Sequence, residues 1–241
     1  FTKAISLQLN LPGAYSGRAR SKFLFKDYPG AIEDYSKEIK LFPNNYANYF
    51  YRGETKFHLE QYQDAIKDYS KTIELNPNYE GAYVGRGLVK ENLEDYQGAI
   101  EDYSKTIELN QKSINTAYHL RAKIKIYLED YQGAIEDYTK LIEIDKPLLD
   151  SKFGYIQRGF IKNLIGNYED ALIDLSKSNE SDPFFPSVLY QRGICKGELE
   201  DYKGALEEFT QLIELEPNIN SDVYYLRGQA SKYLNNFQSA L

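Results

Sequence analysis

An arginine followed by a small residue recurs along this chain at a nearly constant interval, and this recurrence limits the possible folds more than any other feature. The arginines of these Arg-Gly or Arg-Ala pairs are Arg18, Arg52, Arg86, Arg121, Arg158, Arg192 and Arg227. If each repeat starts seven positions before the small residue, the starts are residues 12, 46, 80, 115, 152, 186 and 221, which lie 34 to 37 residues apart. A period of this length indicates an array of similar supersecondary units.

Each repeat carries the same residue types at the same internal positions, which we call slots and count from the repeat start. An aromatic residue fills slot 17 and an alanine fills slot 20 in all seven copies. Slots 4, 7, 8, 11 and 14 share one face of a first helix, while slots 17, 20, 21, 24, 27 and 28 share one face of a second helix. A single helix pair cannot cover its own apolar face, so neighbouring pairs must stack. The sequence therefore predicts an all-α solenoid without β-sheet.

This repeat resembles a known family. The segments Asn48–Gly53, Asp64–Tyr69 and Leu75–Pro77 resemble a tetratricopeptide repeat, and the resemblance extends over essentially the whole chain. It implies antiparallel helix pairs stacked into a right-handed superhelical solenoid. It also implies that the first helices line a concave groove that holds a peptide or protein segment.

The repeat starts predict one solenoid domain. Residues 1–11 are expected to be the tail of a preceding repeat's second helix, because Phe1–Ile5 matches Tyr69–Ile73. Six full repeats then span 12–45, 46–79, 80–114, 115–151, 152–185 and 186–220, and 221–241 is a truncated seventh repeat that ends early in its second helix. Both ends cut through repeats, so we expect the chain to be a piece of a longer protein.

Two segments depart from the pattern. The connector at 145–151 is the longest between repeats, which indicates either a tolerated insertion or a change in stacking angle. Repeat five reads Ser178-Asn-Glu-Ser181 where other copies read Thr-Ile-Glu-Leu, so two apolar slots are polar here, and Phe184 and Phe185 follow. We expect the second helix of this repeat to fray before Ser181.

Charged residues also recur in fixed slots. Slot 7 holds arginine in all seven repeats, and slot 23 holds aspartate or glutamate in all six repeats that include it. These slots lie at nearly the same height in an antiparallel pair, so we predict that Arg86 meets Asp102 and that its counterparts pair likewise. The alternative is that the arginine stem packs while its head reaches solvent. Lysine in slot 11 is expected to join this network.

Composition excludes several classes of function. The formal net charge is −7 and no charge run is basic, which argues against a nucleic-acid ligand. No apolar run approaches the roughly 20 residues that span a bilayer. The single cysteine, Cys195, excludes an intrachain disulfide and fits a reducing compartment, so the cytoplasm is favoured.

No motif for catalysis or for a cofactor is present. The chain has no phosphate-binding loop, no Gly-x-Ser-x-Gly and no His-Glu-x-x-His, and its two histidines have no metal-site spacing. Cys195 occupies slot 10, where we expect a buried structural thiol. We therefore predict a protein that is not an enzyme and that uses no cofactor or metal.

The first-helix slots that face the groove in this family vary strongly between repeats, while the scaffold slots do not. Drift on a solvated face would leave polar residues, but here many of these slots carry aromatic ones, which favours recognition. The candidate groove residues are Phe50, Phe57, His58, His119, Lys123, Tyr127, Phe153, Ile156, Phe160, Tyr190, Ile194 and Tyr225.

The leading hypothesis is an interaction scaffold or adaptor whose largely apolar groove binds an apolar or amphipathic segment of a partner protein. Two alternatives remain open. One is a self-assembling structural module that forms homo-oligomers through its terminal repeats. The other is a regulatory arm of an enzyme that lies outside this sequence.

Overall fold

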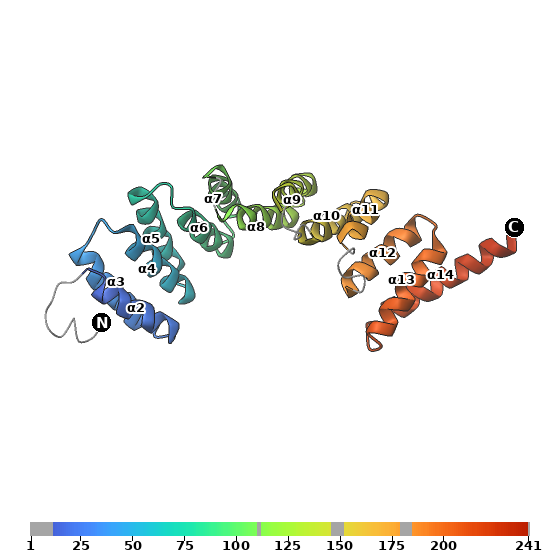
Figure 1. Ribbon diagram of the computed structural model, residues 1–241, viewed down its shortest axis with the longest axis horizontal. Coiled ribbons are helices and arrows are strands. Elements are labelled where there is room, and N and C mark those ends of the chain that lie inside the picture. The colour runs from blue at the N-terminus through green and yellow to red at the C-terminus, as the bar shows by residue number, and fades with distance from the viewer. Residues whose placement is uncertain (1–11, 110–111, 146–151, 179–184, 241) are drawn as a thin grey trace. The chain divides into compact units, whose positions relative to one another are not determined.

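The chain forms short α-helices throughout the part that the structure describes. The computed structural model describes residues 12–109, 112–145, 152–178 and 185–240, which hold thirteen α-helices and no β-strand (Figure 1). The helices are α2 (Ala14–Leu24), α3 (Tyr28–Leu41), α4 (Tyr46–His58), α5 (Tyr62–Leu75), α6 (Glu80–Asn92), α7 (Tyr96–Leu109), α8 (Ile114–Tyr127), α9 (Tyr131–Asp145), α10 (Lys152–Leu164), α11 (Tyr168–Ser178), α12 (Pro186–Glu198), α13 (Tyr202–Leu215) and α14 (Ser221–Ala240). The prediction of an all-α fold is confirmed.

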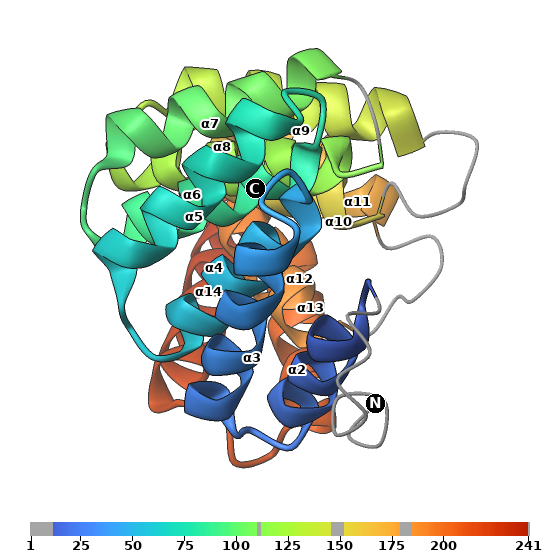
Figure 2. The ribbon, with the colours of Figure 1, turned by 90° about the vertical axis from the view of Figure 1, so that its left-hand side faces the viewer.

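Each of the six full repeats is one helix pair. The first helix ends at or near slot 13 and the second begins at slot 17, so the chain must reverse within a short turn. Figure 2 shows the pair α2 and α3 of the first repeat lying side by side, and the two helices pack along their length. The pairs α4 with α5, α6 with α7, α10 with α11 and α12 with α13 pack in the same way.

In most pairs, the turn is built by three local hydrogen bonds and one unusual backbone conformation; in repeat two the Gln61 side chain makes no capping hydrogen bond. In repeat three, the backbone N–H groups of Glu94 and Asp95 donate to the carbonyls of Glu91 and Lys90, at 3.0 and 2.9 Å. Glu94 has a φ of 61°, in the left-handed region. The Asp95 carboxylate then accepts a hydrogen bond of 3.0 Å from the N–H of Gly98, which caps the second helix. The same slots turn the chain in the other repeats.

The core of each repeat depends on a close approach between the two helices. Slot 8 is glycine or alanine, and in repeats two, three, five and six the slot-24 side chain lies directly over the slot-8 glycine. A Cβ added to Gly87 would lie 2.6 Å from the ring of Tyr103, and one added to Gly193 would lie 2.6 Å from the ring of Phe209. The small residue therefore makes room for the large one, and the two rings are buried.

The chain divides into two compact units, Phe1–Arg121 and Ala122–Leu241, with the boundary inside α8. In the first unit, α3 packs against α4 and α5 against α6, and the first helices α2, α4 and α6 also touch in sequence. In the second unit, α9 packs against α10, α11 against α12 and α13 against α14, while α10 touches α12. In both units, therefore, first helices of neighbouring repeats lie next to one another.

The seventh repeat differs from its prediction. The sequence predicted that this repeat ends early in a second helix, but α14 runs without interruption from Ser221 to Ala240. Continuing the first helix keeps its backbone hydrogen bonds.

Repeat five has a short second helix. Helix α11 spans 11 residues and ends at Ser178, whereas its counterpart α7 spans 14 residues. The polar residues Asn179 and Ser181, the ring of Phe184 and the connector at 146–151, which the sequence singled out, lie outside the described residues.

Candidate partner-binding surface

The predicted ion pairs form inside repeats one, two, three, five and six, where they fix the first helix against the second. The guanidinium of Arg86 donates to both carboxylate oxygens of Asp102, at 3.0 and 2.6 Å, and the Lys90 ammonium lies 2.9 Å from the same carboxylate. The Asp102 side chain is buried, so this network replaces its hydration. Equivalent pairs are Arg18 with Asp34, Arg52 with Asp68, Arg158 with Asp174 and Arg192 with Glu208, each at 2.6 Å. The ion-pair prediction is confirmed.

The same arginines also join neighbouring repeats. The remaining guanidinium nitrogen of Arg86, Nη1, donates to the hydroxyl of Ser70, in the second helix of the preceding repeat, at 3.1 Å. Arg52 donates to Ser36 at 3.0 Å, and Arg158 to Thr139 at 2.9 Å. Each arginine is thus bound on both sides, and the first helix that carries it is fixed within the repeat and against the previous one.

A tyrosine in slot 4 completes the arginine site. The Cζ atom of Arg86 lies 5.8 Å from the centroid of the Tyr83 ring, a cation–π contact. The same contact joins Arg52 to Tyr49 and Arg158 to Tyr155, at 5.7 and 5.6 Å. This role accounts for the arginine in slot 7, which the common family pattern does not contain. These residues position the first helices.

In the first unit, the candidate groove residues contribute largely to internal packing. Phe50 and Phe57 are half-buried and pack against the cluster around Tyr69. Phe50 makes an edge contact with Tyr79 at 5.0 Å between ring centroids, and Phe57 lies 5.9 Å from Tyr62. Their rings therefore offer only part of their surface to a partner.

His58 belongs to a three-ring cluster at the junction of repeats one and two. Its imidazole stacks on Tyr28 with centroids 5.4 Å apart and meets the edge of Phe23 at 5.3 Å, while Phe23 and Tyr28 are 5.5 Å apart. His58 remains exposed at the surface of this cluster. The other histidine, His119, is half-buried on α8. Among the described residues, no group of three or more His, Cys, Asp or Glu side chains could hold a metal ion.

In the second unit, the candidates separate into exposed and internal residues. Tyr127 and Lys123 on α8, Phe153 on α10 and Tyr225 on α14 are exposed, with 68% and 66% of Tyr127 and Tyr225 accessible to solvent. Phe160 is half-buried and packs on the cluster of α10, α11 and α12. These elements are labelled in Figure 1.

Ile156 does not lie at the surface. It is buried in the cluster formed by Ala171, Leu175, Val188 and Cys195, so its side chain offers almost no area to a ligand. Slot 5 lies at the edge of the packed face, and the neighbouring helix α12 covers it in this repeat. Tyr190 and Ile194 are half-buried against the next cluster, around Phe209.

Electrostatics on the first helices are set by a few side chains. Glu54, in slot 9 of α4, is half-buried, and this burial raises the pKa of its carboxyl despite the nearby charges of His58 and Arg20. Asn48, in slot 3, is buried where other repeats have Ala, Gly or Val, and its Nδ2 has no hydrogen-bond partner. Cys195 is buried, as predicted, and this burial raises the pKa of its thiol to about 11, which favours the protonated form.

Sequence reasoning missed two pockets that lie between neighbouring first helices. One, of about 250 Å³, lies between α2 and α4 and is lined by residues that include Arg20, Tyr35, Asn48 and Tyr51. The other, of about 300 Å³, lies between α12 and α14 beside Gly197. Two sequence signals could have indicated these pockets: the polar Asn48 in slot 3 for the first, and Gly197 in slot 12 for the second.

The fold and this variable surface define a helical-repeat interaction protein, in which a constant scaffold presents side chains that differ from repeat to repeat. Models of the tetratricopeptide repeat match residues 48–79, 80–113, 116–147 and 187–218, more than half of the chain. The chain belongs to the tetratricopeptide repeat family. In the described residues, no helix combines the length and apolar character needed to cross a membrane.

Curated relatives match a small part of the chain. Protein SGT1 homolog from Bos taurus is 42% identical over 57 residues, which are 24% of this chain and 17% of the relative. Its counterpart from Homo sapiens is 40% identical over 57 residues, 24% and 16% of the two chains. The match therefore spans about a sixth of the length of these relatives.

Solved structures match over much more of the chain. The crystal structure of YrrB, a tetratricopeptide repeat protein with an unusual peptide-binding site, covers 83% of this chain and 99% of its own, at 20% identity and a TM-score of 0.66. A tetratricopeptide repeat protein from Parabacteroides merdae covers 92% and 86%, at 16% identity and a TM-score of 0.64. MamA covers 68% and 94%, at 25% identity and a TM-score of 0.60. These similarities confirm the fold.

Proposed function

We propose that this chain is a non-catalytic scaffold that binds an apolar or amphipathic segment of a partner protein along its first helices, mainly those of the second unit. Membership in the tetratricopeptide repeat family and the peptide-binding site named for YrrB support the general role. The finer assignment rests on where exposed aromatic side chains lie.

One asymmetry carries this proposal. In the described helices, every exposed tyrosine or phenylalanine lies on a first helix: Tyr127, Phe153, Tyr224, Tyr225 and Tyr233. The aromatic side chains of the second helices are all buried or half-buried. All five of these rings belong to the second unit, whereas the exposed Phe25 of the first unit follows α2 and lies outside a helix. Exposed aromatic residues on one class of helix are typical of an interaction surface, because rings of this size are otherwise buried in the core.

A selection from a random peptide library displayed on phage tests the proposal. The chain is immobilised and the selected peptides are measured by calorimetry against a variant with Tyr127→Ser, Phe153→Ser and Tyr225→Ser. We expect apolar or amphipathic peptides, and we expect the variant to bind them about tenfold more weakly or worse, because it lacks three rings that a ligand would cover.

A matched control removes an exposed apolar residue from a second helix. Ile173 on α11 is exposed, and Ile173→Ser should leave peptide affinity unchanged. Circular dichroism must show unchanged helicity for both variants. If the triple variant binds as well as the unaltered chain, the first helices of the second unit are not the binding surface. Light scattering that shows concentration-dependent association, together with a selection that yields no peptide, would favour the self-assembly alternative.

A further inference from the structure

The junction between two successive first helices carries a recurring group of three residues. These are slot 12 of one first helix, slot 17 of its second helix and slot 13 of the next first helix. At the first junction they are Phe23, Tyr28 and His58, whose three rings lie within 5.3 to 5.5 Å of one another. The side chain of Phe23 fills the space between the two helices.

The second junction repeats this arrangement with a different third member. Phe57 in slot 12 lies 5.9 Å from Tyr62 in slot 17, and the Tyr62 hydroxyl is 3.5 Å from Asn92 in slot 13 of the next helix. In both junctions the slot-12 phenylalanine packs beside the slot-17 ring. An aromatic side chain in slot 12 can therefore occupy the space between two successive first helices.

The sixth junction keeps the two outer rings and lacks the middle one. Tyr202 in slot 17 and Tyr233 in slot 13 of α14 stack with centroids 5.2 Å apart. Slot 12 is Gly197, and a Cβ added there would meet only the Cβ of Ala205, at 4.0 Å. A pocket of about 300 Å³ occupies this position, and both tyrosines line it.

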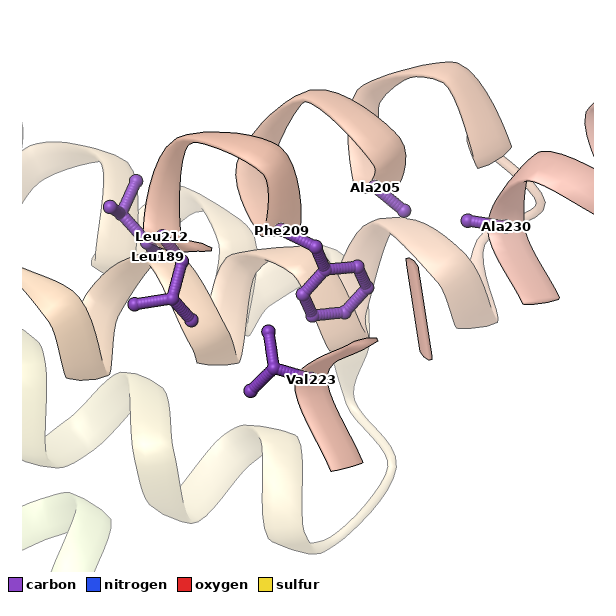
Figure 3. Close-up of a cluster of buried hydrophobic side chains, with 6 residues drawn as sticks. All are labelled: Leu189, Ala205, Phe209, Leu212, Val223 and Ala230. Atoms are coloured by element: carbon purple, nitrogen blue, oxygen red, sulfur yellow. The ribbon is translucent and has the colours of Figure 1, made fainter. Parts of the chain in front are cut away.

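Polar and apolar surface contribute about equally to the walls of this pocket, and the apolar part comes from facing helices. Ala205, Phe209 and Ala230 belong to the buried cluster drawn in Figure 3, in which Ala205 of α13 and Ala230 of α14 point toward each other. Ile194 and Leu226 pack against the same cluster and also line the pocket. Small side chains on facing helices leave a concavity that an aromatic ring can fill.

One charge lies at the rim. Glu198 is exposed and lines the pocket, and Gln229 is the other polar side chain among its lining residues. If an aromatic ring of a partner fills the pocket, a basic residue next to that ring would meet the Glu198 carboxylate. The net charge of −7 also favours a positively charged ligand.

We infer that the pocket beside Gly197 receives an aromatic side chain from a partner segment, with a lysine or arginine next to that side chain in the partner. The partner supplies the ring that Phe23 and Phe57 supply within the chain. This inference rests on the proposed function, because the pocket belongs to the first-helix surface, and it names the chemistry that the surface recognises at one point.

Three blocked pentapeptides test the inference: Gly-Lys-Phe-Lys-Gly, Gly-Lys-Ser-Lys-Gly and Gly-Glu-Phe-Glu-Gly. Each is titrated into the ¹⁵N-labelled chain, and the amide resonances of Gly193, Gly197 and Gln229 are followed. We expect saturable shifts with the first peptide, and affinities about tenfold weaker or worse for the other two, because one lacks the ring and the other repels Glu198.

Two substitutions at Gly197 give the structural control. Gly197→Phe restores the residue of repeats one and two and should fill the pocket, so the shifts caused by Gly-Lys-Phe-Lys-Gly should disappear. Gly197→Ala adds a methyl group in ordinary contact with Ala205 and should keep most of the affinity. A pentapeptide that binds Gly197→Phe as well as the unaltered chain, or that shifts none of these three amides, overturns the inference.

The library selection separates this failure from failure of the proposed function. If selected peptides bind the Gly197→Phe chain unchanged while the triple variant loses them, the surface binds partners and only the pocket assignment is wrong. If the selection yields nothing while the pentapeptide still shifts Gly197, the pocket binds an aromatic side chain but the larger surface proposal is wrong.

Discussion

At the scale of single residues, the arginine in slot 7 has the largest number of roles. Arg86 holds Asp102 within its own repeat, reaches Ser70 of the previous repeat and lies over the ring of Tyr83. A lysine in its place could meet the carboxylate but could not make these planar contacts at once. Arg52 and Arg158 make the same three kinds of contact, which explains the arginine in slot 7 of these repeats.

Replacing Arg86 tests the coupling directly. Arg86→Leu leaves the buried Asp102 with Lys90 as its remaining cation, so we expect a loss of about 1–3 kcal/mol in the free energy of unfolding. The double change with Asp102→Leu should recover part of this loss, because no buried carboxylate then remains without its partner. Urea unfolding of the unaltered chain, the two single variants and the double variant measures the loss and its recovery. Losses that simply add would show that the two residues are not coupled.

The residue in slot 15 gives a second test at this scale. Glu94 has a φ of 61°, whereas Gly166 in the same slot of repeat five has a φ of 79°. A left-handed conformation costs a non-glycine residue about 1–2 kcal/mol, while glycine loses more entropy on folding. We therefore expect Glu94→Gly to stabilise the chain by about 0.5–1 kcal/mol and Gly166→Ala to destabilise it by a similar amount. Thermal unfolding measures the change in stability of each variant. If both substitutions stabilise the chain, or both destabilise it, this account is wrong.

At the scale of helices, a small residue in slot 8 sets the distance between the two members of a pair. Gly87 has no room for a Cβ beneath Tyr103, whereas nothing lies within 4 Å of a Cβ added to Gly228 on α14. The two glycines share a slot but differ in whether a second helix packs on them. They therefore separate the packing role of glycine from its weak intrinsic helix propensity.

Alanine at these two positions should have opposite effects. Gly87→Ala forces the Tyr103 ring to move, and we expect a loss of about 1–3 kcal/mol. Gly228→Ala meets open space and should stabilise α14 by up to about 1 kcal/mol, the helix propensity difference. Chemical unfolding monitored by circular dichroism gives both values. A stabilised Gly87→Ala protein would show that the ring relaxes without cost.

Sequence comparison between repeats predicted the elements well and the surface less well. The helix pairs, the turns and the pairing of Arg86 with Asp102 all follow from residue type and spacing, because each recurs under the same local constraints. Residue type and spacing do not predict how deeply a side chain on the first-helix face is buried. Ile156 and Tyr225 share slot 5, yet α12 covers the first while the second is exposed. That difference depends on packing by the next repeat, which spacing alone does not reveal.

At the scale of the whole molecule, one buried carboxylate in each unit links stability to pH. Burial by itself would raise the pKa of Asp34 and of Asp174. Hydrogen bonds from an arginine and a lysine outweigh this burial, so the pKa of each carboxyl lies below its ordinary value. Asp34 lies in the first unit and Asp174 in the second. Acid should therefore weaken both units by the same mechanism.

The sign of this dependence follows from proton linkage. An unfolded aspartate has a pKa of about 3.9, so the stabilisation from a depressed folded pKa is complete above about pH 5 and is lost as the pH falls through the folded pKa. We expect Asp174→Asn to be less stable than the unaltered chain by a constant amount from about pH 5 to pH 7, and the difference to narrow below about pH 4. Urea unfolding at each pH measures the difference. Asp64, which pairs with Lys67 on an exposed surface, provides the control, and Asp64→Asn should change stability little at any pH. A deficit of Asp174→Asn that stays constant down to the acid transition would show that the carboxylate of Asp174 is not stabilised by its charge.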